Sequence, residues 1–361
     1  MSDFYEIDLL DVESTKSGDA ICLRYRFNNL TWIHVVDGGY QETGNTLVNH
    51  IRKYYDNPTF IDHVVATHND ADHAGGLRAI LENFTVGTLW IHRPWRYAEA
   101  LISRFDSYSS VEHLRRRLRS IYSNLAALED IALERRIPIK EPFQGEQIGY
   151  FTVMAPSYER FIELVVASEK TPESSSVSPH AQGLAGLLGS VAKKAKILVQ
   201  SAWANEIFSP NETSAENDMS VVQFASLLDE RILLTGDVGR SGLVEAIQYA
   251  ARRGTHLSGI YRFQVPHHGS RRNVSTEILD YLLGPRLPAK SGELPRFYSY
   301  ISSAKADKDH PRNSVVRAMY HRGGDVRKTE GQNIAFGKNW PARPDYGPIS
   351  PVEYPTTQET D

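Results

Sequence analysis

Cysteine is almost absent from this chain, which carries one among its 361 residues. A single thiol excludes disulfides within the chain and any zinc site that is built from several thiolates. That residue, Cys22, lies in the apolar stretch Ala20-Ile21-Cys22-Leu23. We therefore expect a small buried side chain and not a nucleophile.

Long apolar runs are also missing. Apolar runs such as residues 64–66 and 232–234 fall far short of the roughly 18 residues that cross a bilayer. The chain begins MSDFYE, with acidic residues where a secretory signal would have basic residues and then an apolar segment. We therefore predict a cytoplasmic protein without a membrane span.

No charge of one sign dominates, because 40 Lys and Arg residues stand against 44 Asp and Glu residues, for a net charge of −4 at pH 7. The surface as a whole would not attract nucleic acid, so binding a polyanion requires a local basic patch. Hydrophobic residues make up 41% of the chain and charged residues 23%, which supplies a buried core and excludes general disorder.

Hydrophobic periodicity predicts a mixed succession of strands and helices. After residues 61–66, a buried-strand pattern, the chain delivers a polar loop and then a helix over about residues 74–83. The other predicted strands are residues 3–10, 20–27, 31–36, 150–155, 219–224, 231–234 and 260–265, with a further helix over 45–55.

Three segments differ from this succession and divide the chain into a domain over residues 1–340, with two insertions, and a tail. Residues 93–136 repeat leucines at heptad spacing, including Leu114 and Leu128, which predicts a long helix that packs on its own domain or forms a homodimer seam. Arginines at 115–117 and 119 form a solvated face or a phosphate-contacting patch. Residues 158–216 predict a loop-rich surface insertion, and the proline-rich tail 341–361 predicts extended chain or a docking peptide for a partner.

The segment that carries most information about function is Thr67-His68-Asn69-Asp70-Ala71-Asp72-His73. It places two imidazoles and two carboxylates within six residues, on a loop after a strand. Alternate residues of extended chain point the same way, so His68 and Asp70 can hold one ion while Asp72 and His73 hold another. This spacing predicts a site for two metal ions.

Two other strand ends supply the remaining ligands. Asp237 follows the strand at 231–234 and can bridge both ions through its two oxygens. His267 and His268 follow the strand at 260–265. Adjacent residues of extended chain point to opposite sides, so we expect one of the two histidines to be a ligand and the other to face the substrate.

These motifs together resemble the metallo-β-lactamase superfamily, and within it the soluble hydrolase domain of the ComEC type. The resemblance spans most of the chain. It rests on Leu10-Asp11-Val12, Gly18-Asp19-Ala20-Ile21, Val36-Asp37-Gly38-Gly39, residues 67–76, residues 217–222, Leu234-Thr235-Gly236-Asp237, residues 265–270, Ile301-Ser302-Ser303 and His310-Pro311.

The resemblance implies a four-layer αβ/βα sandwich of the α/β class, with two metals at one edge of paired mixed sheets. In the wider superfamily the loop reads His-x-His-x-Asp-His, and here Asp70 replaces the middle histidine. Asn217 and Ser220 stand where a third histidine is expected. The first metal site is therefore rich in oxygen donors, so Mn²⁺ or Mg²⁺ competes with Zn²⁺.

The resulting hypothesis is phosphodiester hydrolysis by a hydroxide held between two divalent ions. Asp72, His267 and His310 are the catalytic candidates, although His310 reads equally well as an exposed loop histidine. The predicted substrate contacts are Asn217, Ser220, Ser270, Arg271 and Arg272, and Arg312 and Arg317 are further cations near the site. The predicted metal ligands are His68, Asp70, Asp72, His73, Asp237 and one of His267 and His268.

Three functions compete on these observations. A nuclease acting on DNA or RNA agrees with the resemblance and the paired arginines. A hydrolase of a small phosphoester, a nucleotide or another small ester agrees with the acidic net charge and with insertions that cover the site. A non-catalytic interaction module would use the leucine helix and the tail, but the full ligand set argues against it, and Asp70 argues against β-lactam hydrolysis.

Overall fold

The computed structural model describes residues 2–171 and 198–360, and most of their chain is organised around two seven-stranded sheets. The first sheet has the order β15-β1-β2-β3-β4-β5-β6. Its strands are β15 (Ile334–Lys338), β1 (Phe4–Leu9), β2 (Ala20–Phe27), β3 (Leu30–Gly38), β4 (Phe60–Val65), β5 (Thr85–Trp90) and β6 (Ile139–Lys140). The pairs from β15 to β3 are antiparallel and those from β3 to β6 are parallel.

The second sheet has the order β14-β13-β12-β11-β10-β8-β7. Its strands are β14 (Gly324–Lys328), β13 (Phe297–Ile301), β12 (Arg262–Gln264), β11 (Glu230–Leu234), β10 (Val222–Leu227), β8 (Phe151–Ala155) and β7 (Gln147–Ile148). The pairs from β14 to β11 are parallel, and the others are antiparallel. Both sheets are therefore mixed, as expected.

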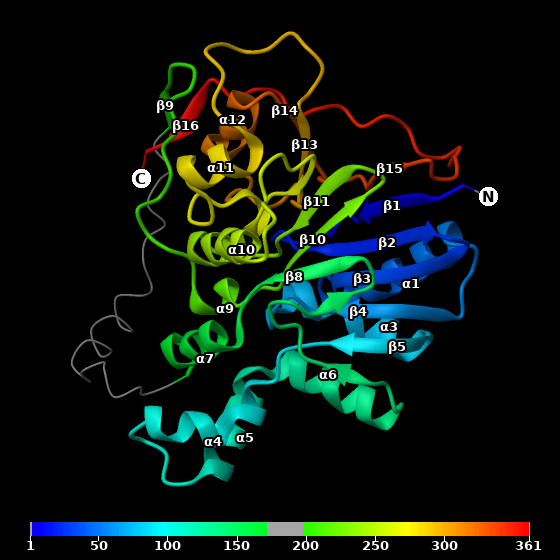
Figure 1. The fold of residues 1–361 in the computed structure, drawn as a ribbon, viewed down its shortest axis with the longest axis vertical. Helices are drawn as coiled ribbons and strands as arrows, with labels where there is room; N and C mark the ends of the chain where they lie inside the picture. The colour runs from blue at the N-terminus through cyan, green and yellow to red at the C-terminus, as the bar shows by residue number, and fades with distance from the viewer. Residues whose placement is uncertain (1, 172–197, 361) are drawn as a thin grey trace.

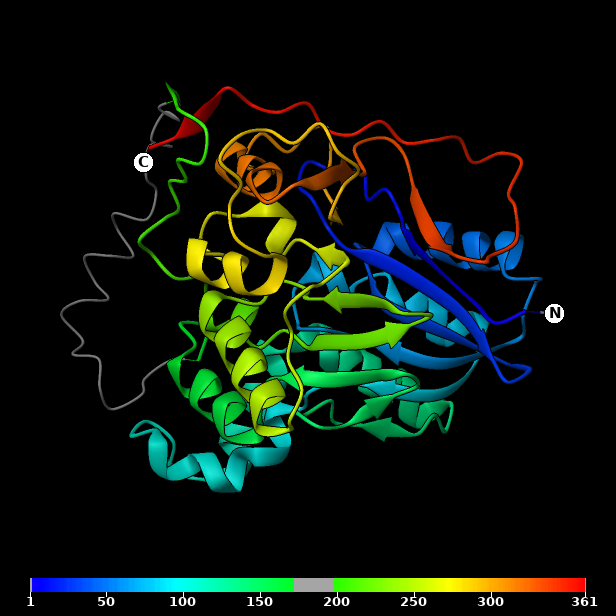
Figure 2. The same cartoon turned by 45° about the horizontal axis from the view of Figure 1, so that its top comes forward.

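The core has three apolar layers, which follow from the alternation of side chains along each strand. Ile21 and Leu23 of β2 face the second sheet, while Cys22 between them faces the helices. Helices α1 (Gly44–Tyr54) and α3 (Leu77–Asn83) cover the first sheet. Helices α10 (Arg240–Arg252), α11 (Thr276–Leu283) and α12 (Asn313–His321) cover the second (Figures 1 and 2). The order helix, sheet, sheet, helix confirms the predicted four-layer sandwich.

The helix predicted over residues 74–83 is divided in the structure. Helix α2 (Ala71–Ala74) ends before Gly75-Gly76, and α3 begins at Leu77. A Cβ atom on Gly76 would lie 2.1 Å from the carbonyl oxygen of Gly38. The two glycines thus let the loop after β4 pack directly against the end of β3, which brings its polar residues to the sheet edge.

The long helix predicted within residues 93–136 is also wrong, because it is broken at Tyr122. Helix α5 (Val111–Ile121) ends there and α6 (Ser123–Glu134) begins. Asn69 accepts hydrogen bonds from the backbone N–H groups of Asn124 and Leu125, at 3.1 and 3.3 Å, and so caps α6. The leucines at 114, 118, 125 and 128 are at most 2% exposed and pack on the first sheet's helices, so this face is covered by the chain itself.

Several short elements lie in the two predicted insertions. Residues 93–136 also hold η2 (Pro94–Tyr97), α4 (Ala98–Leu101) and η3 (Ile102–Arg104), and η1 (Gln41–Thr43) precedes α1. Residues 158–216 hold α7 (Tyr158–Ala167), β9 (Leu198–Gln200) and the start of α9 (Ala215–Asp218). Of the loop-rich insertion predicted there, residues 172–197 lie outside the described residues. None of the described helices has the length and apolar character that crossing a membrane requires.

The C-terminal segment runs across the molecule and returns to the second sheet's helices (Figures 1 and 2). Its strand β16 (Thr357–Glu359) pairs with β9 in a separate two-stranded sheet. Arg343 binds Asp8 and Glu6 of β1, at 2.5 and 2.6 Å. Arg317, predicted to lie near the site, is 0% exposed and instead donates to the carbonyls of Pro355 and Ala202, both at 2.7 Å.

Glu206 anchors the segment that follows β9. Its side chain is 1% exposed and accepts hydrogen bonds from Arg322 and Thr276, at 2.6 and 2.7 Å, beside His321. Burial alone would raise the pKa of this carboxyl, but the hydrogen bonds from His321 and Arg322 lower it from 4.5 to about 2. The anchored segment leads on to residues 209–211, which line the cavity described below.

Because the lowered pKa links folding to ionisation, Glu206→Gln is expected to reduce the free energy of unfolding by about 3 kcal/mol at pH 7. The contribution of Glu206 is full above pH 4.5 and is lost as the pH falls from 4.5 to about 2. Urea denaturation at pH 7 and pH 3 measures both effects. The control is Glu212→Gln, whose 61% exposed side chain pairs with Arg240 and should change stability little. Equal effects of the two substitutions would contradict this account.

Candidate metal centre

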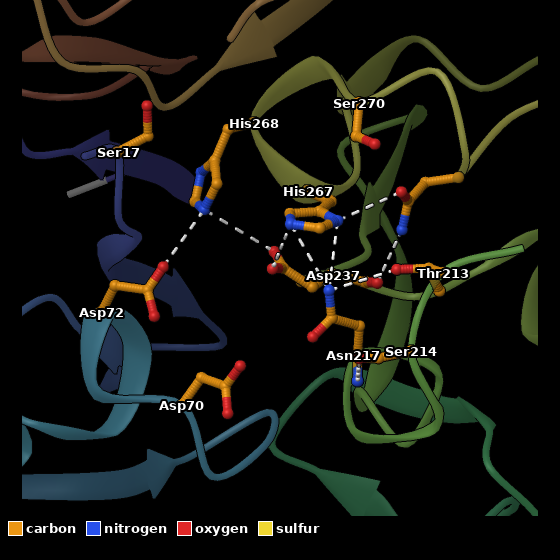
Figure 3. A network of polar contacts seen from close by, with 12 residues as sticks. Ser17, Asp70, Asp72, Thr213, Ser214, Asn217, Asp237, His267, His268 and Ser270 are labelled. Atoms are coloured by element: carbon orange, nitrogen blue, oxygen red, sulfur yellow. Dashed lines mark hydrogen bonds and ion pairs between the residues drawn. The ribbon is translucent and has the colours of Figure 1, made fainter. Parts of the chain in front are cut away.

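The candidate site lies at the ends of strands, where the two sheets face each other. Each contributing loop follows or precedes a strand, so the sheet pairing itself brings the loops together. Asp19 precedes β2, Asp37 ends β3, the loop 67–73 follows β4, Asp237 follows β11, and His267 and His268 in η4 (His267–Gly269) follow β12. Figure 3 shows Asp70 and Asp72 on one side of the site, facing Asp237, His267 and His268 on the other.

Asp237 lies at the centre of the cluster, with a side chain that is 4% exposed. Its Oδ1 atom is 3.2 Å from His73 Nε2 and 3.9 Å from His268 Nε2. Its Oδ2 atom is 3.5 Å from His267 Nε2 and 4.0 Å from His68 Nε2. The two oxygens therefore face different histidines, as the bridging role predicted for Asp237 requires.

Four buried atoms at this point have no hydrogen-bond partner among the described residues. They are the Nε2 atoms of His68, His73 and His268 and the Oδ1 atom of Asp237. Buried polar atoms are nearly always paired, so four that converge on one volume call for a missing partner. Imidazole nitrogen and carboxylate oxygen are common ligands of Zn²⁺ and Mn²⁺. These residues therefore fit a divalent cation.

The donors define two positions, which we call the first and second metal positions. The second position lies among Asp72, His73, His268 and Asp237, where Asp72 Oδ2 is 3.5 Å from His268 Nε2 and 3.8 Å from His73 Nε2. The first position lies among His68, Asp70 and Asp237, where Asp70 Oδ2 and Asp237 Oδ2 are each 4.0 Å from His68 Nε2. The pairing of His68 with Asp70 and of Asp72 with His73 stays a prediction, since His68, His73 and Asp237 also form a group of donors within 4.8 Å of one another.

The two adjacent histidines have different surroundings. His268 is 4% exposed, its Nδ1–H donates to the carbonyl of Ser302 at 3.0 Å, and its Nε2 faces the second position. The side chain of His267 is 24% exposed, and its Nδ1 lies 3.1 Å from both Asn273 Oδ1 and Asn217 Nδ2 (Figure 3). His268 thus faces the candidate metal position, and His267 lies between the centre and the neighbouring cavity.

The backbone of this turn is strained. His267 and His268 have φ values of 49° and 53°, a conformation that side chains other than glycine rarely adopt. Gly269 follows with φ 83°, and a Cβ atom there would lie 2.8 Å from Pro311. Hydrogen bonds from His267 N–H to the carbonyl of Gly236, and from Arg312 N–H to that of Gly269, both at 3.1 Å, hold the turn in place. Strain of this kind persists where the surrounding structure imposes it.

The cluster attracts positive charge. Burial alone would raise the pKa of Asp237, but His73, His267 and His268 lower it well below its usual range. Burial opposes a charge on His268 as well, yet Asp237 and Asp72 raise its pKa to about 9. Burial lowers the pKa of His267 to about 4 despite the neighbouring Asp237. The field that holds protons on His268 also favours a divalent cation, which would displace them.

A second set of residues orients the ligands. Asp37 Oδ2 accepts from His73 Nδ1–H at 2.8 Å, which turns Nε2 of that ring toward Asp237. Thr67 donates its hydroxyl to Asp37, at 2.7 Å, and lies 3.0 Å from His68 Nδ1. Such contacts fix the tautomer and orientation of a histidine ligand.

Ser220 belongs to this second set, and its predicted role in substrate binding is wrong. The residue is 0% exposed, so no substrate can reach it. Its Oγ lies 3.2 Å from His68 Nδ1 and accepts from the backbone N–H of Asp237 at 3.1 Å. Asn217, the other residue predicted to replace the third histidine, contacts His267, whose ring lies at the site.

A cavity of about 450 Å³ opens beside the centre. Three arginines and one aspartate line it, so its charge suits an anion. Its lining residues are Ser209, Pro210, Asn211, His267, Ser270, Arg271, Arg272, Asp309, His310 and Arg312. Ser270, Arg271, Arg272 and His310 are thus brought to one place, as predicted.

His310 lines the side of this cavity that is nearest to the metal centre. Its ring stacks on His267, with centroids 5.4 Å apart. Its Nδ1–H donates to Asp307 Oδ2 at 3.3 Å, an interaction that helps to lower the pKa of that carboxyl well below its usual range, although burial opposes this. Asp307 also accepts from the hydroxyl of Ser17 at 2.8 Å. His310 is therefore a positioned histidine and not an unconstrained loop residue.

The sequence patterns missed two acidic residues of the site. Asp19 is 2% exposed and lies near His73 and His268, and its Oδ2 accepts from Gln264 at 3.0 Å. Asp37 supports His73 as described. Each is a lone aspartate at a strand end, without a spaced partner that would signal a metal site. The one signal for them in the sequence is that they lie in Gly18-Asp19 and Val36-Asp37-Gly38-Gly39, two of the motifs on which the family resemblance rests.

Comparisons with known proteins found a matching family model and similar solved structures. Residues 30–142 match the family model of the Metallo-beta-lactamase superfamily, which confirms the resemblance to the superfamily, but not to its ComEC type, over the segment that holds Asp37 and the loop 67–73. Similar solved structures include that of a candidate metallo-beta-lactamase from Thermotoga maritima. It is 11% identical, with 69% of this chain and 92% of that chain covered and a TM-score of 0.32. No curated protein matches the chain.

Since Asp37 orients His73, Asp37→Asn is expected to weaken the binding of Mn²⁺ or Zn²⁺ by about 10-fold to 100-fold. Isothermal titration of the metal into chelator-treated protein measures this change. Asp62→Asn is the control, because Asp62 accepts from the backbone N–H of Ile33 at 2.8 Å and lies outside the candidate metal groups. Unchanged affinity in a folded Asp37→Asn variant would show that the contact does not support the ligand.

Proposed function

We propose that this chain is a metal-dependent hydrolase that cleaves phosphodiesters, with DNA or RNA as the substrate class. The superfamily match supports metal-dependent hydrolysis in general. The single observation that carries the finer proposal is the cavity beside the metal centre, which Arg271, Arg272 and Arg312 line. Guanidinium groups bind phosphate oxygens through paired hydrogen bonds, so this wall suits a phosphate-bearing substrate.

The residues have separate roles in this proposal. Asp72, His73, His268 and Asp237 would hold an ion at the second position, and His68, Asp70 and Asp237 would hold one at the first. Bound divalent ions would supply Lewis acidity that activates water and neutralises phosphoryl oxygens. Asp37, Thr67 and Ser220 keep the histidines in position, and the arginines of the cavity orient the substrate phosphate.

His310 is the candidate general acid, which would protonate the leaving oxygen. Asp307 accepts its Nδ1–H, so the other ring nitrogen is the one available to a substrate in the cavity. His267 stacks on His310 and also contacts Asn217, which places both rings between the metal centre and the arginines. A proton donor at this point stands beside the expected position of the scissile phosphate.

The size of the cavity favours a second candidate, a hydrolase of nucleotides or other small phosphoesters. A volume of about 450 Å³ falls within the range of sites that enclose small ligands. In this case the substrate would occupy the cavity as a whole. In the nuclease case only one phosphate of a longer chain would enter it.

Labelled single-stranded DNA, duplex DNA, RNA and a small chromogenic phosphodiester, each with Mn²⁺, Mg²⁺ or Zn²⁺, test the proposal and separate the two candidates. We expect chelator-sensitive cleavage that Asp72→Ala abolishes. Cleavage of a polymer would establish a nuclease, whereas turnover of the small diester alone would favour the second candidate. Absence of hydrolysis from every substrate with every metal would contradict both.

Loss of the proposed general acid in His310→Gln is expected to lower kcat by about 10²-fold to 10⁴-fold and to leave KM little changed. Steady-state kinetics on the best substrate of the panel measure this. A diester with a good leaving group, such as p-nitrophenolate, needs no protonation and should show a smaller loss. An equal loss for good and poor leaving groups would contradict the assignment of His310 as the acid.

A further inference from the structure

Among the described residues, a lysine lies beside the first metal position and none lies beside the second. Lys170 Nζ lies 3.0 Å from Asp70 Oδ1, and the two side chains are 49% and 31% exposed. No spacing pattern in the sequence connects Lys170 with Asp70, which lies 100 residues away along the chain. The second oxygen of Asp70 faces the first metal position, 4.0 Å from His68 Nε2.

The backbone holds Lys170 in this place. It follows α7, in a short turn where Thr171 N–H donates to the carbonyl of Ser168 at 3.1 Å and Lys170 N–H donates to Ser168 Oγ at 3.2 Å. Ser168 is 3% exposed and its hydroxyl donates to Glu216 of α9. Thr171 is 4% exposed. Ser168 and Thr171 are thus the buried residues of this turn, Glu169 and Lys170 are exposed, and the ammonium of Lys170 lies beside Asp70.

The charges at the two positions are consequently unequal. The second position has Asp72 and Asp237, with Asp19 close to His268, and in the described part of the chain no lysine or arginine pairs with any of these three carboxylates. The first position has Asp70, whose negative charge is already offset by the ammonium of Lys170. It also has one oxygen of Asp237, which faces the second position with its other oxygen. Asp70 also belongs to none of the four described groups of three His or Asp donors that lie within 4.8 Å of one another.

We propose that Lys170 weakens the first metal position, so that the protein holds one ion tightly at the second position and a second ion only loosely. An ammonium and a divalent cation that share one carboxylate repel each other, and Coulomb interaction over a few ångströms is strong in a partly buried site. Lys170 therefore acts as a selectivity residue for metal occupancy. This inference rests on the metal centre of the proposed function and extends it to ion stoichiometry.

Metal binding without any substrate tests this inference. Chelator-treated wild-type protein and Lys170→Met are titrated calorimetrically with Mn²⁺ and with Zn²⁺, and the retained metal is counted by elemental mass spectrometry after gel filtration. We expect wild-type protein to retain one ion per chain. Lys170→Met should retain two, with the second bound about 10-fold to 100-fold more tightly than in the wild type.

Two matched variants isolate the charge of Lys170. Lys170→Arg keeps a cation beside Asp70 and should behave like the wild type. Lys53→Met removes an exposed lysine that pairs with Asp345 at 2.5 Å, outside the site, and should also leave metal binding unchanged. Circular dichroism confirms that each variant is folded. If Lys170→Met does not fold, Lys170→Gln replaces it in the same titration.

A double variant tests the route through Asp70. Lys170→Met should tighten the second ion less in an Asp70→Asn background, because Lys170 there lacks the carboxylate that holds its ammonium beside the first position. Two equally tight ions in the wild type, or no change in Lys170→Met, would overturn the inference and leave the proposed function intact. Failure of every variant and of the wild type to bind any ion would instead overturn the proposed function.

Discussion

Asp237 imposes the constraint on which the rest of the site depends. It is a carboxylate with a side chain that is 4% exposed, placed between two sheets with Asp19, Asp37 and Asp72 nearby. Buried carboxylates of like sign are strongly unfavourable unless cations or hydrogen bonds compensate them. Here three imidazoles and a set of backbone and side-chain donors do so only in part, since four buried atoms make no hydrogen bond among the described residues, although two of them, His73 Nε2 and Asp237 Oδ1, lie 3.2 Å apart. A divalent cation would complete the compensation.

The scaffold serves to bring these groups together and to keep them in place. The parallel parts of both sheets deliver their loops to a common edge, and Gly75-Gly76 let one of these loops approach the end of β3. The strained turn at His267 and His268 sends one ring to the metal centre and the other to the cavity. Far from the centre, Glu206 secures the segment that continues into the cavity wall. Distant packing and local chemistry are thus connected through short stretches of chain.

Much of this arrangement could be predicted from the sequence, because its signals are local. The loop from His68 to His73 packs its ligands into six residues, and Asp237 and the histidine pair directly follow recognisable strands. Regular alternation in β2 and the apolar run of β4 similarly revealed the sheets. Strand β2, for example, begins and ends at the predicted residues 20 and 27.

Interactions between distant segments escaped prediction. Tyr122 breaks the expected long helix because Asn69, from the metal loop, caps α6. Ser220 and Arg317 look like ligand-binding residues in sequence, but the fold buries both. Asp19, Asp37 and Lys170 act through partners that no spacing pattern connects to them. The sequence could not show which of His267 and His268 faces the metal position, because the orientation of His268 depends on a hydrogen bond to the carbonyl of Ser302, which follows β13.

The central claim is that the unpaired donors around Asp237 form a metal centre. Anomalous diffraction from crystals of the protein grown with Mn²⁺, recorded on both sides of the manganese absorption edge, tests it most directly. The account predicts a strong anomalous peak among Asp72, His73, His268 and Asp237. A well-ordered site without a peak, with its histidines paired to protein atoms or water, would contradict it.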